Sequence, residues 1–263
     1  PVTVVQAPVQ PPMLAPSEVR RAIKVAYGAQ AFGEIARLAL FRGGVLPLFA
    51  LMVGASNAHL GVLSGMPDGL QALTFLVSPL VARYGKRRWM VTLMGLGSIA
   101  FLGLFLVNPI HSLWGSQAAV GALILFMLLQ TGFTGVGVAA WWPLLNDILP
   151  ADMIGHFFGR LRTIFECSAL LVLLLASGYL GKSPPAWKFM IVFALGAIGL
   201  FMRVSFVARL PDPVGANPDA KVSVSQHLAS LKQPLQDRPF AYFCLVSFIL
   251  SFLIYVPVPL YVP

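Results

Sequence analysis

Residues 78–91 read SPLVARYGKRRWMV and place four positive charges, Arg83, Lys86, Arg87 and Arg88, within six positions between two long apolar runs. The rest of the chain is strongly apolar. Of its 263 residues, 58% are hydrophobic and only 10% are charged, against roughly 25% in soluble domains. This composition predicts an integral membrane protein.

Seven apolar runs are long enough to cross the hydrocarbon as helices, which takes about 20 residues at 1.5 Å each. The approximate spans are 33–54, 60–82, 89–108, 117–140, 163–180, 187–208 and 239–262. Backbone groups must be satisfied internally in lipid, so an all-α fold is expected. The predicted organisation is a Pro-rich arm and cytoplasmic pre-helix segment over 1–32, a six-helix transmembrane bundle over 33–209, a cytoplasmic central loop over 210–238 and a seventh transmembrane helix over 239–263.

The basic residues predict the orientation, because loops on the cytoplasmic side are enriched in Lys and Arg. With the N-terminus in the cytoplasm, thirteen basic residues lie on the inner side and two, Lys182 and Lys188, on the outer side. The thirteen are Arg20, Arg21, Lys24, Arg83, Lys86, Arg87, Arg88, Arg160, Arg162, Arg209, Lys221, Lys232 and Arg238. The basic cluster therefore anchors the topology, and the inner membrane of a bacterium is the expected location.

The same loop resembles a signature of the major facilitator superfamily, which reads approximately G-x-L-A-D-R-x-G-R-K. The matching positions are Leu80, Arg83, Gly85, Lys86 and Arg87, whereas Ser78, Val81 and Ala82 replace Gly, Ala and Asp. A second stretch, WWPLLNDILPADMIGHFFGRLR at 141–162, is similar to another pattern of the family. Its matching positions are Asp147, Pro150, Gly155, Gly159 and Arg160.

The resemblance implies the first six-helix bundle of a twelve-helix transporter, with a second bundle that begins at residue 239 and is mostly missing. A fragment of a longer chain is therefore expected, or else a chain that works with a second bundle or with partner membrane subunits. In the family, the loop carboxylate is thought to help latch the cytoplasmic helix ends. Ala82 cannot accept those hydrogen bonds. Asp147 is expected either to pair with Arg83 or Arg87 or to remain a solvated loop carboxylate.

Polar residues within apolar spans are candidate site residues, because charges in hydrocarbon cost roughly 2.5–3.5 kcal/mol each. The candidates for substrate binding or coupling are Arg42, Asp68, Gln71, Gln130 and Glu166. Arg42 lies near the bilayer midplane and needs an anionic partner, from the protein or from a substrate. Asp68, on the helical stripe of Gln71, could bind a proton or cation, or could cap a helix broken at Pro67.

Other polar positions favour local roles. Glu34 and Arg37, three residues apart, are expected to form a structural pair, and Glu166 is expected to pair with Arg162 one turn away. Arg203 is expected to extend to the inner interface. The glycines of TGFTGVGVAAWW, at 131–142, are expected to allow close helix packing.

Several classes of function find no support in the sequence. The four histidines are dispersed near loops and lack neighbouring ligands, so neither a metal nor a cofactor is expected. There is no phosphate-binding loop, no dinucleotide motif and no catalytic triad, so we expect no enzyme. Nucleic-acid binding is not expected either, because no basic face is available.

Two interpretations of function stay open. The first is a secondary transporter that moves an unknown small solute across the lipid bilayer by alternating access, with or without proton coupling. The second is a non-transporting relative that serves as a structural subunit or assembly factor of a membrane complex, for example a pigment–protein complex. A polar cavity would favour transport, whereas a cavity filled by Phe and Leu side chains would favour the subunit.

Overall fold

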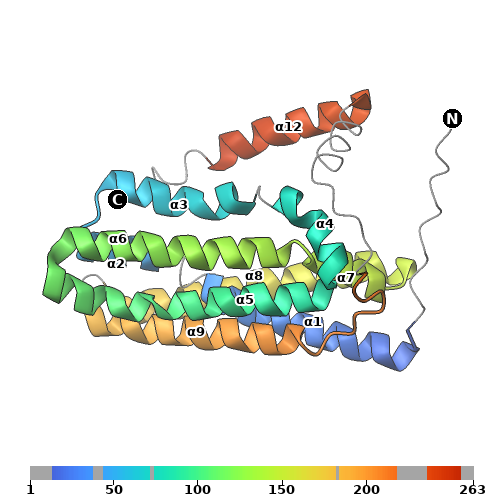
Figure 1. The fold of residues 1–263 in the computed structure, drawn as a ribbon, viewed down its shortest axis with the longest axis horizontal. Coiled ribbons are helices and arrows are strands. Elements are labelled where there is room, and N and C mark those ends of the chain that lie inside the picture. The colour runs from blue at the N-terminus through green and yellow to red at the C-terminus, as the bar shows by residue number, and fades with distance from the viewer. Residues whose placement is uncertain (1–13, 38–43, 72–73, 182–183, 218–235, 256–263) are drawn as a thin grey trace.

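The computed structural model describes residues 14–37, 44–71, 74–181, 184–217 and 236–255, and over those ranges every regular element is helical. The helices lie along the long axis of the molecule (Figure 1). Their bounds are α1 Pro16–Arg37, α2 Val45–Met52, α3 Asn57–Gln71, α4 Thr74–Tyr84, α5 Lys86–Leu102, α6 Leu104–Val138, α7 Trp141–Ile148, η2 Ala151–Met153, α8 Ile154–Leu180, α9 Ala186–Val207 and α12 Arg238–Tyr255.

Three helical stretches in the described part of the chain are long and apolar enough to cross a membrane, judged by length and composition. They are Lys86–Ile148, which unites α5, α6 and α7, Ala151–Leu180 and Ala186–Val207. The all-helical class is therefore confirmed. The count of seven spans and the cytoplasmic N-terminus stay predictions.

The first helix begins earlier than the sequence analysis placed it. α1 starts at Pro16, where the fixed φ of proline suits the first turn of a helix, and the Glu18 side chain accepts a hydrogen bond from Ala15 N at 3.1 Å. Small residues recur at helical spacing on its buried face: Ala22, Ala26 and Ala29. Hydropathy missed this segment because Arg20, Arg21 and Lys24 interrupt it, whereas the helix forms by packing its small-residue face on α8 and α9.

The predicted break between the third and fourth spans is present. Helix α6 leaves helical geometry at Gly115, where φ is 81° and ψ is 179°. Residues with a Cβ rarely adopt this backbone conformation, so glycine is needed there. Gly115 ends the segment NPIHSLWG, which the sequence analysis had identified as a break.

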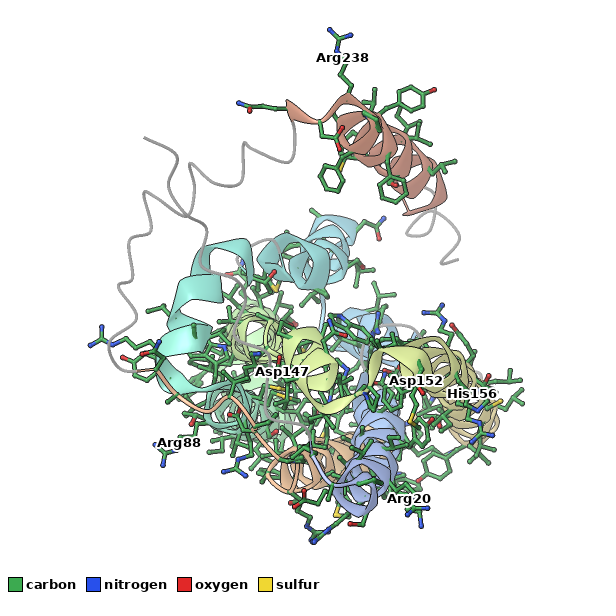
Figure 2. All side chains as sticks on the ribbon, turned by 90° about the vertical axis from the view of Figure 1, so that its right-hand side faces the viewer. Arg20, Arg88, Asp147, Asp152, His156 and Arg238 are labelled. Atoms are coloured by element: carbon green, nitrogen blue, oxygen red, sulfur yellow. The ribbon has the colours of Figure 1, made fainter. Side chains whose placement is uncertain are left out.

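The helices pack around two apolar clusters. The main packed pairs are α5 with α6, α1 with α9 and with α8, α3 with α6, and α5 with α9. One cluster centres on Phe49, Phe101 and Phe193, and the other on Met90, Trp141, Leu144 and Phe157 toward the other end. Helix α12 lies apart from this bundle, on the side of α3, in both views (Figures 1 and 2).

The second cluster lies toward the end of the bundle that carries the basic loop. Figure 2 looks onto this end, where Arg20, Arg88, Asp147, Asp152 and His156 lie. Arg20 and Arg88, from segments far apart in the sequence, therefore lie at the same end of the bundle, together with Asp147 and Asp152.

Candidate functional site

A cavity of about 640 Å³ lies between the two apolar clusters. Its wall includes Ala36 and Leu200 from the first cluster and Trp141 and Leu161 from the second. Small-molecule sites span roughly 300–1,000 Å³, so this cavity has the size of a binding site for a small solute.

Helix α1 contributes charge to this cavity. Glu34 is only 2% exposed; it accepts a hydrogen bond from Gln30 Nε2 at 3.2 Å, and its Oε1 lies 3.9 Å from Arg37 Nη1. The expected Glu34–Arg37 pair is therefore present. Both residues line the cavity and are not confined to the protein surface. The pair therefore contributes charged groups to the candidate site in addition to its structural role within α1.

Arg203 on α9 corrects one expectation. The Arg203 side chain was expected to extend to the inner interface. Instead it lines the cavity, and its Nε is buried. Among the described residues, Glu34 and Arg37 carry charges that act on it. Gly33 makes this position available, because a Cβ there would lie 2.7 Å from Arg203 Cδ. The absence of a side chain on α1 therefore allows Arg203 to turn inward beside Glu34.

The polar wall opposite is a single stretch of α6. Gln130 is 3% exposed, donates a hydrogen bond from Nε2 to Thr134 Oγ1 at 3.3 Å, and accepts one from Thr131 Oγ1 at 3.2 Å. All three residues line the cavity, as does Gly135. Gln130 is therefore the predicted candidate that the structure places directly in the cavity wall.

The glycines of α6 divide between two roles. Gly137 packs against α5, where an added Cβ would lie 3.0 Å from Met94 Cγ, as expected for close helix packing. Gly135 has no atom within 4 Å of a Cβ position and instead widens the cavity. The expectation of close packing therefore holds for Gly137 and fails for Gly135.

Aromatic rings and two arginines form the part of the wall near α7 and α8. The rings of Trp142 and Phe158 lie 5.3 Å apart. The guanidinium carbons of Arg37 and Arg162 lie 5.4 Å and 4.9 Å from the centre of the Phe165 ring. Such cation–π contacts orient guanidinium groups. Phe165 therefore fixes the arginines of two different helices beside the same cavity.

Of the remaining predicted candidates, only Glu166 has a described side chain, and it is not among the cavity-lining residues. Glu166 forms the expected local pair, 2.5 Å from Arg162 Nη2, and both side chains are largely exposed. Arg42 lies outside the described residues, and so do the side chains of Asp68 and Gln71 on α3. Pro67, directly before Asp68, lines the cavity. Sequence reasoning did not select Glu34 and Arg203 as site residues, because each had a plausible local role.

The basic loop makes a different contact from the one expected. Asp147 on α7 pairs with Lys86, not with Arg83 or Arg87 and not with solvent alone. Lys86 is the first residue of α5, and its Nζ also donates to Pro143 O at 3.5 Å. The packing of α5 against α7 decides this choice, because it brings Lys86 to Asp147.

Arg87 forms hydrogen bonds with the start of the predicted central loop. Its backbone N–H donates to Asp212 Oδ2 at 3.0 Å, and its Nη1 donates to Leu210 O at 3.2 Å. Gly85, with φ 83°, turns the chain into α5 next to this contact. Asn217 N donates to Ala82 O at 3.1 Å. Asp212 thus places a carboxylate at the N-terminus of α5, where the helix dipole favours it.

Gly159 and Arg160, the last two residues of the predicted loop motif, lie exposed in the first turns of α8. Gly159 O accepts a hydrogen bond from Thr163 Oγ1 at 3.1 Å, and nothing lies within 4 Å of a Cβ position on Gly159. The described residues contain no group of three or more His, Cys, Asp or Glu side chains that could hold a metal ion.

Long apolar helices around a cavity of mixed polar and apolar lining are typical of an integral membrane protein of the helical-bundle class. A comparison with protein families identifies the family. The model of the Major Facilitator Superfamily matches residues 26–263 of the chain. The chain belongs to this superfamily, which confirms the resemblance seen in the two loop motifs, and membership implies a membrane transporter in general. Neither the curated proteins nor the solved structures gave a match.

Proposed function

We propose that this protein is a secondary transporter that moves a small solute across the cytoplasmic membrane by alternating access, through the cavity between the two apolar clusters. The observation that carries the proposal is the polar lining of that cavity. Glu34 and Gln130 are almost fully buried, and Arg203 Nε is buried beside them. Polar groups at membrane depth are costly and mark substrate or ion pathways.

The polar lining also favours transport over a purely structural role. A structural subunit would gain stability from a core filled by apolar side chains. Here Gln130, Thr131 and Thr134 of α6 instead line the same cavity as Glu34 and Arg203. The second interpretation, a non-transporting subunit, has no comparable observation in its favour.

We propose a cytoplasmic N-terminus and seven spans, with the basic end of the bundle inside. Single cysteines at Ser112 and His156, both exposed, test the orientation after the two native cysteines are replaced. A membrane-impermeant maleimide should label the Ser112→Cys variant in intact cells and the His156→Cys variant only after lysis. The reverse pattern would overturn the orientation and leave the fold unaffected.

Within this mechanism, Gln130 and Arg203 bind the solute, and Glu34 is the group that could couple transport to protons. Arg42, Asp68 and Gln71 remain proposed cavity residues on the first and second predicted spans. Lys86, Arg87, Asp147 and Asp212 hold the inner helix ends together. Proton coupling predicts that uptake follows an imposed pH gradient in the parent protein and no longer does so in Glu34→Gln.

The decisive experiment uses the full chain in sealed vesicles given a mixture of small metabolites, whose contents are then compared with those of empty vesicles by mass spectrometry. We expect at least one solute to accumulate. Its uptake should fall in Arg203→Gln and persist in Arg209→Gln, which removes an exposed charge from the same end of the chain. Accumulation of no solute, or equal uptake by the two variants, would refute the proposal.

A further inference from the structure

The cavity lining contains two buried hydrogen-bond donors that no described residue of the protein uses. Arg203 Nε and Trp141 Nε1 are buried and have no hydrogen-bond partner among the described residues, and both residues line the cavity. Buried polar atoms are nearly always paired, so each unpaired one calls for an explanation. An arginine and an indole can donate hydrogen bonds but cannot accept them. The missing partner is therefore an acceptor.

The charges around the cavity also favour an acceptor of negative charge. The charged residues of its described lining are Glu34, Arg37, Arg162 and Arg203. Even when Glu166, the partner of Arg162, is included, three guanidinium groups face two carboxylates. Among these described residues positive charge therefore exceeds negative charge by one, and attraction to an anion is stronger at the buried Arg203 Nε than in bulk water.

Neighbouring groups orient the arginines in the absence of a ligand. The Phe165 ring contacts Arg37 and Arg162, and the space above Gly33 receives Arg203. Guanidinium groups suit the planar, bidentate recognition of a carboxylate. The rings of Trp142 and Phe158 offer an apolar wall in the same cavity.

We propose that the cavity binds a small organic anion, whose oxygen atoms accept hydrogen bonds from Arg203 and Trp141 and whose apolar part packs on Trp142 and Phe158. This inference rests on the proposed transport function and names its class of substrate. Because Nε and Nε1 are enclosed, the ligand reaches them after a side-chain rotation of the kind common at binding sites.

The test measures binding and not transport. The full chain in nanodiscs of neutral lipid is titrated with a panel of aromatic and short aliphatic carboxylates, each with its matched amide and amine, and with phenyl phosphate. Two readouts are followed: the midpoint of thermal unfolding and the tryptophan fluorescence, to which Trp141 and Trp142 contribute among the five tryptophans of the chain. Carboxylates should raise the midpoint and change the fluorescence, whereas their amides and amines should do neither. Binding of phenyl phosphate along with the carboxylates would extend the site to oxyanions in general.

The variants assign the binding to the two donors. Arg203→Gln should weaken the binding of carboxylates roughly 10- to 100-fold, because a charge-assisted hydrogen bond is lost. Trp141→Phe keeps an aromatic ring, removes the donor together with part of the buried indole, and should weaken binding by a smaller factor. It also keeps the test valid if Arg203→Gln fails to fold. Arg209→Gln should bind like the parent protein.

Three results would overturn the anion site: amines or amides that bind as well as the acids, full affinity in both Arg203→Gln and Trp141→Phe, or no binder in the panel. Failure of the anion-site proposal can be distinguished from failure of the transport proposal. A carboxylate that binds but never accumulates in vesicles refutes transport and keeps the anion site. A cation or neutral solute that accumulates refutes the anion site and keeps transport.

Discussion

Gly33 on α1 leaves the space that Arg203 on α9 occupies: a Cβ on Gly33 would lie 2.7 Å from Arg203 Cδ and 2.9 Å from its Nε. The two residues are 170 positions apart and meet because α1 packs along α9. A glycine in the first helix therefore decides where a charge of the sixth predicted span is placed.

Gly33→Ala should impair the site more than the fold. The atoms that would clash belong to a flexible arginine side chain, so Arg203 can move away at little cost in stability. We expect uptake or ligand binding to fall while the unfolding midpoint changes little. Gly121→Ala is the matched control, since nothing lies within 4 Å of its Cβ position. Normal binding by Gly33→Ala would show that Arg203 need not lie against α1.

Gly199→Ala should instead impair the fold. Its Cβ would lie 2.8 Å from the backbone oxygen of Phe32, and a backbone atom cannot move without shifting a helix. We expect a loss of about 1–3 kcal/mol in the free energy of unfolding, as for other overpacked sites, measured by denaturation in mixed micelles. Stability equal to that of Gly121→Ala would mean that α1 and α9 pack less closely than described.

The Lys86–Asp147 pair should stabilise the protein more than the Arg162–Glu166 pair does. The side chains of the first pair are 19% and 16% exposed, whereas those of the second are 70% and 48% exposed. Double-mutant cycles with Gln and Asn should give a coupling energy of about 1–3 kcal/mol for the shielded pair and below about 1 kcal/mol for the exposed one. Equal coupling energies would contradict the contact between α5 and α7.

Asp212→Ala should loosen the start of the central loop. It removes the side-chain acceptor of Arg87 N and leaves a donor at the N-terminus of α5 unpaired. Loss of such a cap costs about 0.5–2 kcal/mol, and trypsin should cleave after Arg209 faster than in the parent protein. Asp152→Ala, at an exposed carboxylate, is the control. Unchanged cleavage in Asp212→Ala would show that the loop is held by other contacts.

The sequence alone selected one residue of the cavity lining and passed over two others, for a physical reason. Gln130 was predicted because an amide in an apolar run has no good alternative to an interior position. Glu34 and Arg203 were given local roles, because a charged residue near a helix end can always reach water. The structure brings both to one cavity, where neither helix alone supplies the partner.

The sequence by itself determined the class of the molecule and the unequal distribution of positive charge between the two ends of its helices. Long apolar runs must become helices in lipid, and clustered Arg and Lys residues must collect at one end of them, whatever the details of packing. Tertiary structure decided which charges meet. Lys86 pairs with Asp147 where Arg83 and Arg87 were expected, and Arg203 turns inward beside Glu34. Such choices depend on side-chain shape and on the absence of a single Cβ at Gly33. Neither of these can be read from the periodicity or the composition of the sequence.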